Sequence, residues 1–248
     1  MGVTLVLLVR HGLTATTGTV LTGRTPGIWL DDRGRAQAAA LAARLAAVPL
    51  DAIITSPLER CRETAEALAA VRDGSPVAVT DDERLSECKY GDWTNKPLKV
   101  LAKDPLWRVV QAHASAVRFP GADGESMLDM QHRAVSAVRD WNGRLGPDAA
   151  YVICSHGDVI KAVIADSLGM HLDLSQRIQV DPCSLSVIRY TPLRPFLIRM
   201  NDSGGGTADL ARRAPASHAS AGQQAARQHV GGQQAAEGDA MVGGGAGG

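Results

Sequence analysis

Two histidines each follow a short apolar run and precede a glycine, in Arg10-His11-Gly12 and in Ser155-His156-Gly157. A third apolar run ends at Thr55-Ser56 and is soon followed by Arg60. If these runs are parallel strands of one sheet, their carboxyl ends meet at the same edge, where α/β proteins bind ligands. Two imidazoles and at least two guanidinium groups, those of Arg10 and Arg60, would then share one crevice.

This combination of side chains suits the transfer of a phosphoryl group to a histidine. The group in transfer spreads negative charge over three oxygens, so catalysis depends on positioning and on positive charge. Arg10 and Arg60 offer bidentate donors that keep their protons. One neutral imidazole can attack phosphorus, and the other adds a third cation when it is protonated. Gly12 and Gly157 would let a phosphate approach the backbone closely.

Metal binding is the competing interpretation, because two histidines and a carboxylate could hold zinc. Two arginines directed at the same point would repel a dication, however, and the chain has neither an H-E-x-x-H motif nor a histidine pair four residues apart. It also lacks the glycine-rich fingerprints of dinucleotide sites and P-loops. We therefore expect no metal and no cofactor.

The elements that must position these residues follow from an alternation of short apolar runs and longer amphipathic stretches. This alternation predicts an α/β fold, a three-layer sandwich with a mostly parallel central sheet and helices on both faces. In Ser56-Pro57-Leu58-Glu59 we expect a capping box that opens a helix, and we expect Leu128 to point inward from a later helix. The predicted strands are 4–9, 52–55, 77–79, 151–155, 185–190 and 196–200; the predicted helices are 32–48, 57–70, 125–145 and 159–168, with loops and short helices over 83–124.

Composition sets the domain boundary and the expected environment. Of 248 residues, 45% are apolar, and 26 basic side chains match 26 acidic ones, so we expect neither nucleic-acid nor membrane binding. The apolar run 3–9 is too short to span a bilayer, and we expect a cytoplasmic protein. Half of the residues from 201 to 248 are Gly or Ala, which predicts a domain over 1–200 and a disordered Gly/Ala/Gln-rich tail over 201–248.

The cysteines and the assembly state are less informative. Cys61, Cys88, Cys154 and Cys183 include no C-x-x-C pair, so buried or semi-buried free thiols are expected. Cys61 and Cys88 each stand beside a residue with an expected role and could modulate a site. The sequence leaves a homodimer open.

Several motifs, in this order along the chain, resemble those of the histidine phosphatase superfamily, also called phosphoglycerate-mutase-like. The resemblance covers nearly all of residues 4–190. Its motifs are Leu8-Val9-Arg10-His11-Gly12 with Thr14, Leu30 with Gly34-Arg35-Ala36-Gln37-Ala38, Ser56 to Ala65, Leu85-Ser86-Glu87 with Gly91-Asp92-Trp93, Gly124-Glu125-Ser126, and Ser155-His156-Gly157.

The resemblance implies roles for individual residues. It makes His11 the nucleophile and Glu87 the proton donor to the leaving oxygen, the role of a well-placed general acid. The phosphate pocket would consist of Arg10, Arg60 and His156. Thr22 and Gly23 stand where family members contact substrate, and so does Thr17. At position 17 the family often has Asn, and Leu13 replaces a common Glu, so substrate preference is open while the chemistry is intact.

The family contains both phosphatases and phosphomutases, and some members bind a phospho-ligand without turnover. A mutase needs a second anion pocket and a lid that excludes water. The segment 88–155 is shorter than in phosphoglycerate mutases and lacks their Arg-Arg substrate motif. We therefore predict a metal-independent phosphomonoester hydrolase that acts on a small phosphorylated metabolite. A phosphoglycerate-mutase-type phosphomutase is the first alternative, and a non-catalytic phospho-ligand binding module is the second.

Overall fold

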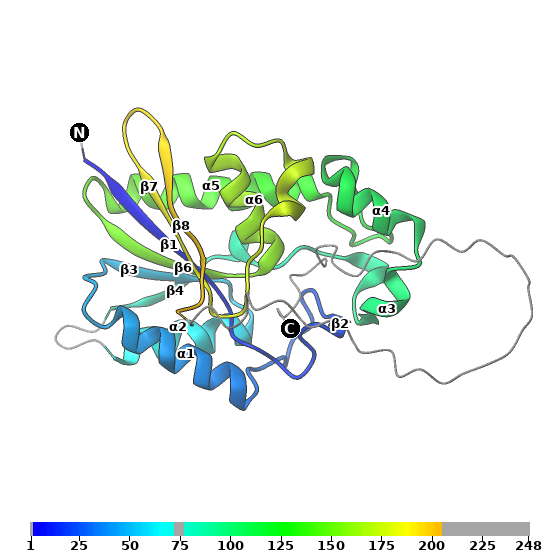
Figure 1. Cartoon of the computed structure of the whole chain (residues 1–248), viewed down its shortest axis with the longest axis horizontal. Helices are drawn as coiled ribbons and strands as arrows, with labels where there is room; N and C mark the ends of the chain where they lie inside the picture. The colour runs from blue at the N-terminus through cyan, green and yellow to red at the C-terminus, as the bar shows by residue number, and fades with distance from the viewer. Residues whose placement is uncertain (1, 72–76, 205–248) are drawn as a thin grey trace, which may run out of the picture. The chain divides into compact units, whose positions relative to one another are not determined.

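The computed structural model describes residues 2–71 and 77–204, which form a six-stranded mixed sheet with helices on both faces (Figure 1). This confirms the predicted α/β sandwich. The strand order is β4-β3-β6-β1-β7-β8. The first four strands in this order pair in parallel, and β7 and β8 pair antiparallel at one edge. These strands are β1 (Thr4–Arg10), β3 (Ala52–Thr55), β4 (Val79–Asp81), β6 (Ala150–Ser155), β7 (Leu185–Tyr190) and β8 (Pro195–Asp202).

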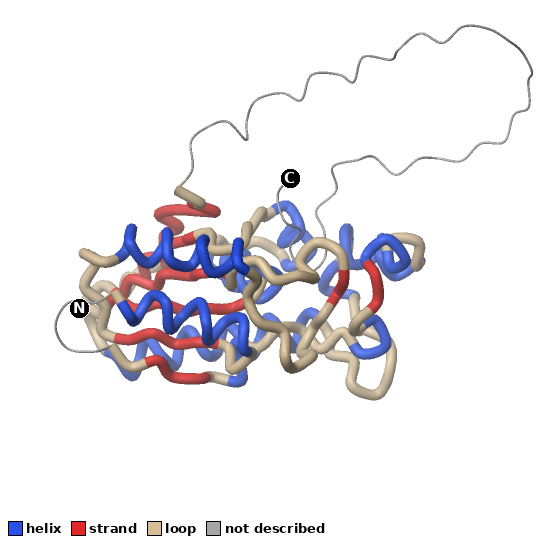
Figure 2. Tube along the Cα trace, turned by 90° about the horizontal axis from the view of Figure 1, so that it is seen from below, coloured by secondary structure: helices blue, strands red, loops and turns tan. Residues whose placement is uncertain are grey.

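Two separate apolar cores lie on the two faces of the sheet. On one face, α1 (Asp32–Leu45) and α2 (Glu59–Ala70) lie side by side, as Figure 2 shows, and cover alternate residues of β1 such as Leu7 and Val9. On the other face, α5 (Met127–Leu145) and α6 (Gly157–Ser167) cover the intervening residues. The period of two along a strand therefore divides one nearly continuous apolar run between two cores.

The helix starts use short polar side chains. Asp31 caps α1 by accepting the Gly34 N–H at 2.8 Å, and Ser126 caps α5 by accepting the Asp129 N–H at 3.0 Å. On α5 the expectation for Leu128 is wrong, because this side chain is 50% exposed. Met127 and Met130 point into the core in its place.

The segment after β4 consists of loops and short elements, as predicted, and lies at one end of the sheet (Figure 1). Within it a two-residue strand, β5 (Lys96–Pro97), pairs antiparallel with β2 (Val20–Leu21). The short helices are η1 (Glu83–Leu85), η2 (Gly91–Trp93), α3 (Leu98–Leu101), α4 (Pro105–Ala112), η3 (Ala114–Ala116) and, after α6, η4 (Leu172–Arg177).

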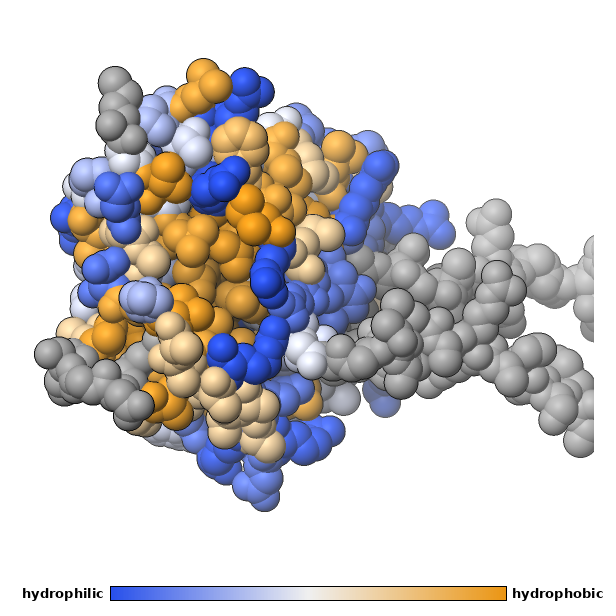
Figure 3. Space-filling view, turned by 60° about the vertical axis from the view of Figure 1, so that its left-hand side comes forward, coloured by the Kyte–Doolittle hydropathy of each residue, from blue (hydrophilic) through white to orange (hydrophobic). Residues whose placement is uncertain are grey.

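The edge strand β8 carries exposed apolar side chains, Phe196, Ile198 and Met200, at alternate positions. Figure 3 shows apolar side chains gathered on the face that comes forward when the left-hand side of Figure 1 is turned to the viewer. β8 ends at Asp202, two residues past the domain end expected at 200. The rest of the predicted disordered tail, 205–248, lies outside the described residues. Within the described part of the chain, no helix is long and apolar enough to cross a bilayer.

Candidate active site

The predicted site residues come from the carboxyl ends of three neighbouring parallel strands. β1 ends in Arg10 and is followed by His11, and β6 ends in Ser155 and is followed by His156. β3 leads into α2, whose second residue is Arg60. The rings of His11 and His156 lie edge to face with their centres 5.2 Å apart. The sheet therefore brings together the residues that the sequence placed at one edge.

The capping box predicted at residues 56–59 does not form. α2 begins at Glu59, and its N-cap position, Leu58, makes no side-chain capping hydrogen bond. The hydroxyl of Ser56 instead lies 2.8 Å from His156 Nε2. This serine therefore orients an imidazole of the site, and its hydroxyl oxygen also accepts the Leu58 N–H at 3.4 Å, before the helix that begins at Glu59.

The tautomer of His11 follows from its hydrogen bonds. Nδ1 lies 2.8 Å from the carbonyl oxygen of Gly12, so it is the nitrogen that carries the proton. Nε2 then keeps its lone pair and accepts from Arg60 Nε at 3.3 Å. Burial, and next the charges of Arg60 and Arg10, hold the pKa of His11 well below its usual value. His11 is thus neutral, with an unprotonated Nε2.

Arg60 connects the two histidines. Its Nη2 donates to the Gly23 carbonyl at 2.7 Å and lies 3.3 Å from His156 Nδ1. Within the described residues its Nη1 has no hydrogen-bond partner, although this atom is buried. A buried guanidinium N–H without an acceptor is costly to a protein on its own and is suited to an anion.

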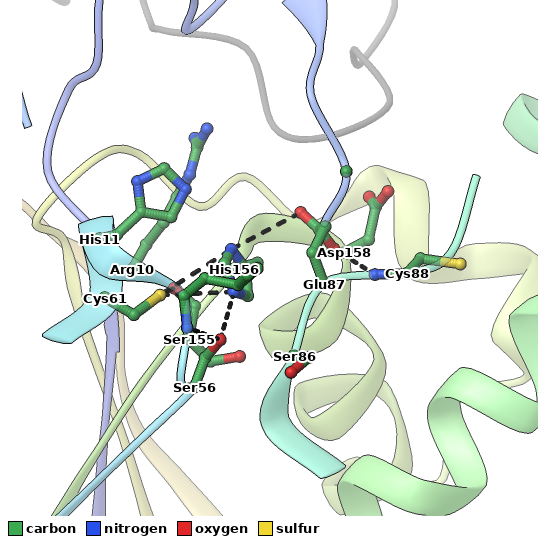
Figure 4. Close-up of polar contacts among 12 residues, drawn as sticks. Arg10, His11, Ser56, Cys61, Ser86, Glu87, Cys88, Ser155, His156 and Asp158 are labelled. Carbon is green, nitrogen blue, oxygen red and sulfur yellow. Dashed lines mark hydrogen bonds and ion pairs between the residues drawn. The ribbon is translucent and has the colours of Figure 1, made fainter. Parts of the chain in front are cut away.

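His156 is fully buried, and Ser56, Cys61 and Glu87 lie around its ring (Figure 4). It accepts at Nδ1 from Arg60, so its Nε2 donates to Ser56, and Cys61 Sγ lies 3.4 Å from the same nitrogen. Burial and the charge of Arg60 hold its pKa well below the usual range. His156 is therefore neutral and does not supply the third cation that its protonated form would, and the positive charge at the site comes from Arg10 and Arg60.

Glu87 lies on the far side of His156, with its Oε2 4.0 Å from Nδ1 of that ring. It is only 4% exposed. Burial, and next the charge of Asp158, raise its pKa to about 7. At neutral pH this carboxyl therefore exists in both protonation states, as a general acid and base requires.

Other described residues hold this site and were not given roles from the sequence. Arg133 donates to the carbonyls of Arg84, Ser86 and Glu87 at 2.7, 2.7 and 3.1 Å, and its guanidinium also forms an ion pair with Glu125. Glu125 belongs to the Gly124-Glu125-Ser126 motif, which was the only signal available for this role.

A second group of supporting residues lies near Arg10 and Glu87. Asp158 accepts the hydroxyl of Tyr90 at 2.7 Å, and Lys161 Nζ lies 3.9 Å from its carboxylate. All three residues are buried. Asp158 directly follows the Ser155-His156-Gly157 motif, and a carboxylate with a lysine three residues later on a predicted helix was its available signal.

A small pocket, partly open to solvent, lies over these groups. His11, Arg10, Arg60 and Glu87 line it together with the expected substrate residues Thr17, Thr22 and Gly23. His156 and Gly157 do not line it; Gly157 is the buried first residue of α6. The Arg60 guanidinium occupies the lone pairs through which the two imidazoles would ligate a metal ion, and no group of three His, Cys, Asp or Glu side chains in the described ranges is placed to hold one.

The four cysteines are free and buried, as predicted. Cys61 contacts His156, and the backbone N–H of Cys88 donates to Glu87 Oε1 at 2.9 Å. Burial raises the pKa of the Cys88 thiol well above its usual value. Cys61 therefore packs against the site, and Cys88, in its thiol form, contacts it through its backbone N–H.

Comparison with known proteins assigns a family to this geometry. The model of the family described as "Histidine phosphatase superfamily (branch 1)" matches residues 6–203. A glucosyl-3-phosphoglycerate phosphatase of Mycolicibacterium vanbaalenii is 35% identical over 182 residues, which are 70% of this chain and 78% of that one. A probable phosphoglycerate mutase, GpmB, of Yersinia enterocolitica is 29% identical over 209 residues, 83% of this chain and 94% of the relative.

Solved structures share the fold. A mycobacterial glucosyl-3-phosphoglycerate phosphatase aligns with a TM-score of 0.70 and 24% identity, covering 81% of this chain and 99% of that one.

Proposed function

Because the chain belongs to the histidine phosphatase superfamily (branch 1), we propose that it is a metal-independent phosphomonoester hydrolase that acts through a phosphohistidine on His11. The substrate is a small phosphorylated metabolite, in keeping with the two arginines and the histidine, Arg10, Arg60 and His11, that line one small pocket. The observation that carries the proposal is the neutral His11, whose unprotonated Nε2 lies beside the guanidinium of Arg60 on the wall of that pocket.

In the first half-reaction, the substrate phosphate replaces the internal partners of Arg60 and takes up its unpaired Nη1–H. Nε2 of His11 forms a bond to phosphorus while the bond from phosphorus to the ester oxygen breaks. Protonated Glu87 gives its proton to that oxygen, and the alcohol leaves. The positive charge that develops on the ring of His11 is stabilised by its Nδ1–H bond to the Gly12 carbonyl.

In the second half-reaction, water attacks the phosphorus of phosphohistidine. Ionised Glu87 removes a proton from this water, and the bond between phosphorus and Nε2 breaks. Inorganic phosphate leaves, and His11 and Glu87 return to their starting protonation states. The intermediate pKa of Glu87, about 7, allows the same carboxyl to serve in both directions.

Hydrolysis is favoured over mutase chemistry by the shortness of segment 88–155 and by its lack of an Arg-Arg pair. The relative of higher identity carries the name of a phosphatase, whereas the other carries the name of a probable mutase. The first assay therefore includes both reactions. A panel of phosphomonoesters is tested for release of phosphate in the presence of a chelator. In parallel, 3-phosphoglycerate is tested for isomerisation with and without bisphosphoglycerate.

The decisive variant is His11→Ala, with His132→Ala as the matched control because His132 is exposed on α5. We expect His11→Ala to lower turnover by at least about a thousandfold and His132→Ala to leave it unchanged. Rapid quenching in base followed by mass spectrometry should detect phosphate on His11 in the unaltered protein. Full activity of His11→Ala would disprove the proposal, as would phosphate release that the chelator abolishes. Isomerisation without release of phosphate would make the protein a mutase. No activity in either assay would favour a binding module.

A further inference from the structure

The residues that line the pocket are of two kinds. Arg10, His11 and Arg60 are the ones suited to a phosphate. The remaining lining residues are aliphatic or bear hydroxyl groups, apart from Tyr90, Glu87 and two glycines. They are Val20, Leu21 and Leu98 on the aliphatic side, and Thr14, Thr17 and Thr22 on the hydroxyl side.

The other lining residues carry no positive charge. Among the described residues that line the pocket, the only arginines are Arg10 and Arg60, and there is no lysine. Both guanidinium groups are fixed in place, Arg10 at its Nη1 by the carbonyl of Val180 at 2.7 Å and Arg60 by that of Gly23 at 2.7 Å. A second anion beside the remaining lining residues would meet no counter-charge from them.

Three basic residues, Arg24, Lys89 and Lys99, stand directly beside pocket residues in the chain, but none of them lines the pocket. Arg24 directly follows Gly23, but its Nε donates to the Glu87 carbonyl at 2.6 Å and its Nη2 lies 3.7 Å from the carboxylate of Glu125. It lines two neighbouring pockets together with Lys89. The one carboxyl in the main pocket, that of Glu87, would itself repel a second anion whenever it is ionised.

We propose that the alcohol part of the substrate is uncharged and bears hydroxyl groups, as in a polyol or sugar phosphate, and that a leaving group with its own carboxylate or second phosphate is disfavoured. The proposal rests on the proposed function of the site. Transfer of a carboxylate against Val20, Leu21 and Leu98 would remove its water without replacing it by a partner. Threonine hydroxyls and the backbone of Gly18 and Gly23 can exchange hydrogen bonds with an alcohol in place of water.

Two ligands that differ at a single carbon test this inference. Glycerol 3-phosphate and 3-phosphoglycerate share the same phosphate ester and central hydroxyl, and differ only in a CH₂OH group in place of a carboxylate. Their Kd values are measured by calorimetry with the His11→Ala variant, so that neither ligand is consumed. We expect glycerol 3-phosphate to bind at least about tenfold more tightly, because only the carboxylate must be desolvated without a counter-charge.

A second variant should shift the ligand preference the other way, because it adds a positive charge to the pocket. Val20 is the one half-buried member of the aliphatic side, so a lysine at this position can extend toward the pocket without unfolding the core. We expect Val20→Lys, added to His11→Ala, to move the ratio of Kd values toward 3-phosphoglycerate by about tenfold. Val20→Met, which has similar length and no charge, should leave the ratio unchanged. Thermal unfolding of all three proteins confirms that each is folded.

The outcomes separate the two proposals. Turnover of 4-nitrophenyl phosphate by the unaltered protein, and its loss in His11→Ala, tests the proposed function alone. Tighter binding of 3-phosphoglycerate, equal binding of the two ligands, or binding of neither overturns the inference about the leaving group whether or not the protein is a phosphatase. A Val20→Lys variant that leaves the ratio unchanged overturns it as well, because the aliphatic side would then not face the bound ligand.

Discussion

Glu87 is a buried carboxyl that receives one backbone N–H and faces another carboxylate, Asp158, through space. An acid in this position protonates the departing oxygen. An alkyl phosphate needs that proton, whereas nitrophenolate leaves easily without it. We therefore expect Glu87→Gln to lower kcat/KM for an alkyl phosphate by about 10² to 10⁴, and that for 4-nitrophenyl phosphate much less. Steady-state kinetics with both esters measures the difference. Equal losses would contradict the acid role.

The pH dependence of the reaction belongs to the same residue. Burial, followed by Asp158, raises the pKa of Glu87 to about 7, so its protonated form is present below that pH and is lost above it. We expect kcat/KM for an alkyl phosphate to fall as pH rises through about 7. The lowered pKa of His11 keeps the nucleophile unprotonated through the same range. The profile is measured between about pH 6 and 9. Persistence of the basic limb in Glu87→Gln would assign it to another group.

Residue patterns predicted the phosphate end of the site because its members follow apolar strands, and strand ends meet at one sheet edge. Arg10, His11, Arg60 and His156 were all found in this way. Glu87 could not be, since it stands in an irregular segment, and only the family resemblance singled it out. Ser56 was misinterpreted as a cap because its sequence fits a capping box equally well. The helix begins at Glu59 rather than at Pro57, and the contact of Ser56 with His156 joins residues that are far apart in the sequence.

At the scale of elements, α5 supports the loop that carries Glu87. Arg133 on this helix donates to three carbonyls of that segment, those of Arg84, Ser86 and Glu87, and is held by the Glu125 carboxylate at 2.6 Å. A planar guanidinium can make these bonds together, whereas an ammonium group cannot. The arrangement ties the position of the general acid to a packed helix.

This support predicts a selective kinetic effect. We expect Arg133→Met to lower kcat/KM for an alkyl phosphate by about tenfold or more, since small displacements of an acid are costly, with a smaller loss for 4-nitrophenyl phosphate. Arg133→Lys should recover part of the difference. Arg139→Met on the same helix is the control, because Arg139 is 69% exposed at its side chain and only pairs with Asp166 at 3.4 Å. Equal losses with both esters would indicate a structural role alone.

The positions of long elements were predictable and those of short pairings were not. β3 and β7 have the predicted bounds, and α5 begins within two residues of the predicted start, because each has a strong period or an uninterrupted apolar run. The pairing of β2 with β5 has no such signal. Each strand has two residues, and their pairing depends on segments far apart in the chain. Since Val20 and Leu21 line the pocket, the part of the site that selects the alcohol was the part least visible in the sequence.

At the scale of the described chain, the last strand, β8, contacts the loop that holds Arg10. Asn201 on β8 accepts the Asp181 N–H at 2.7 Å and donates to its carboxylate at 2.8 Å. Asp181 lies in the same loop as Val180, whose carbonyl fixes Arg10, and as Cys183, whose N–H donates to the Arg10 carbonyl at 3.0 Å. Asp202 adds an ion pair to Arg44 on α1 at 2.8 Å. The C-terminal end of the sheet therefore holds the loop that orients Arg10, the arginine that we propose binds phosphate.

Two shortened chains test this connection and the expectation that residues 201–248 have no role in chemistry. A chain that ends at Gly204 keeps β8, and we expect its kcat and KM to match those of the full chain. A chain that ends at Met200 loses Asn201 and Asp202, so we expect a lower Tm and a KM raised by about tenfold, because the removed hydrogen bonds contribute about 1 kcal/mol each. Asn201→Ala in the full chain should raise KM in the same direction while the fold is kept. Loss of activity on truncation at Gly204 would instead place part of the working site in residues 205–248.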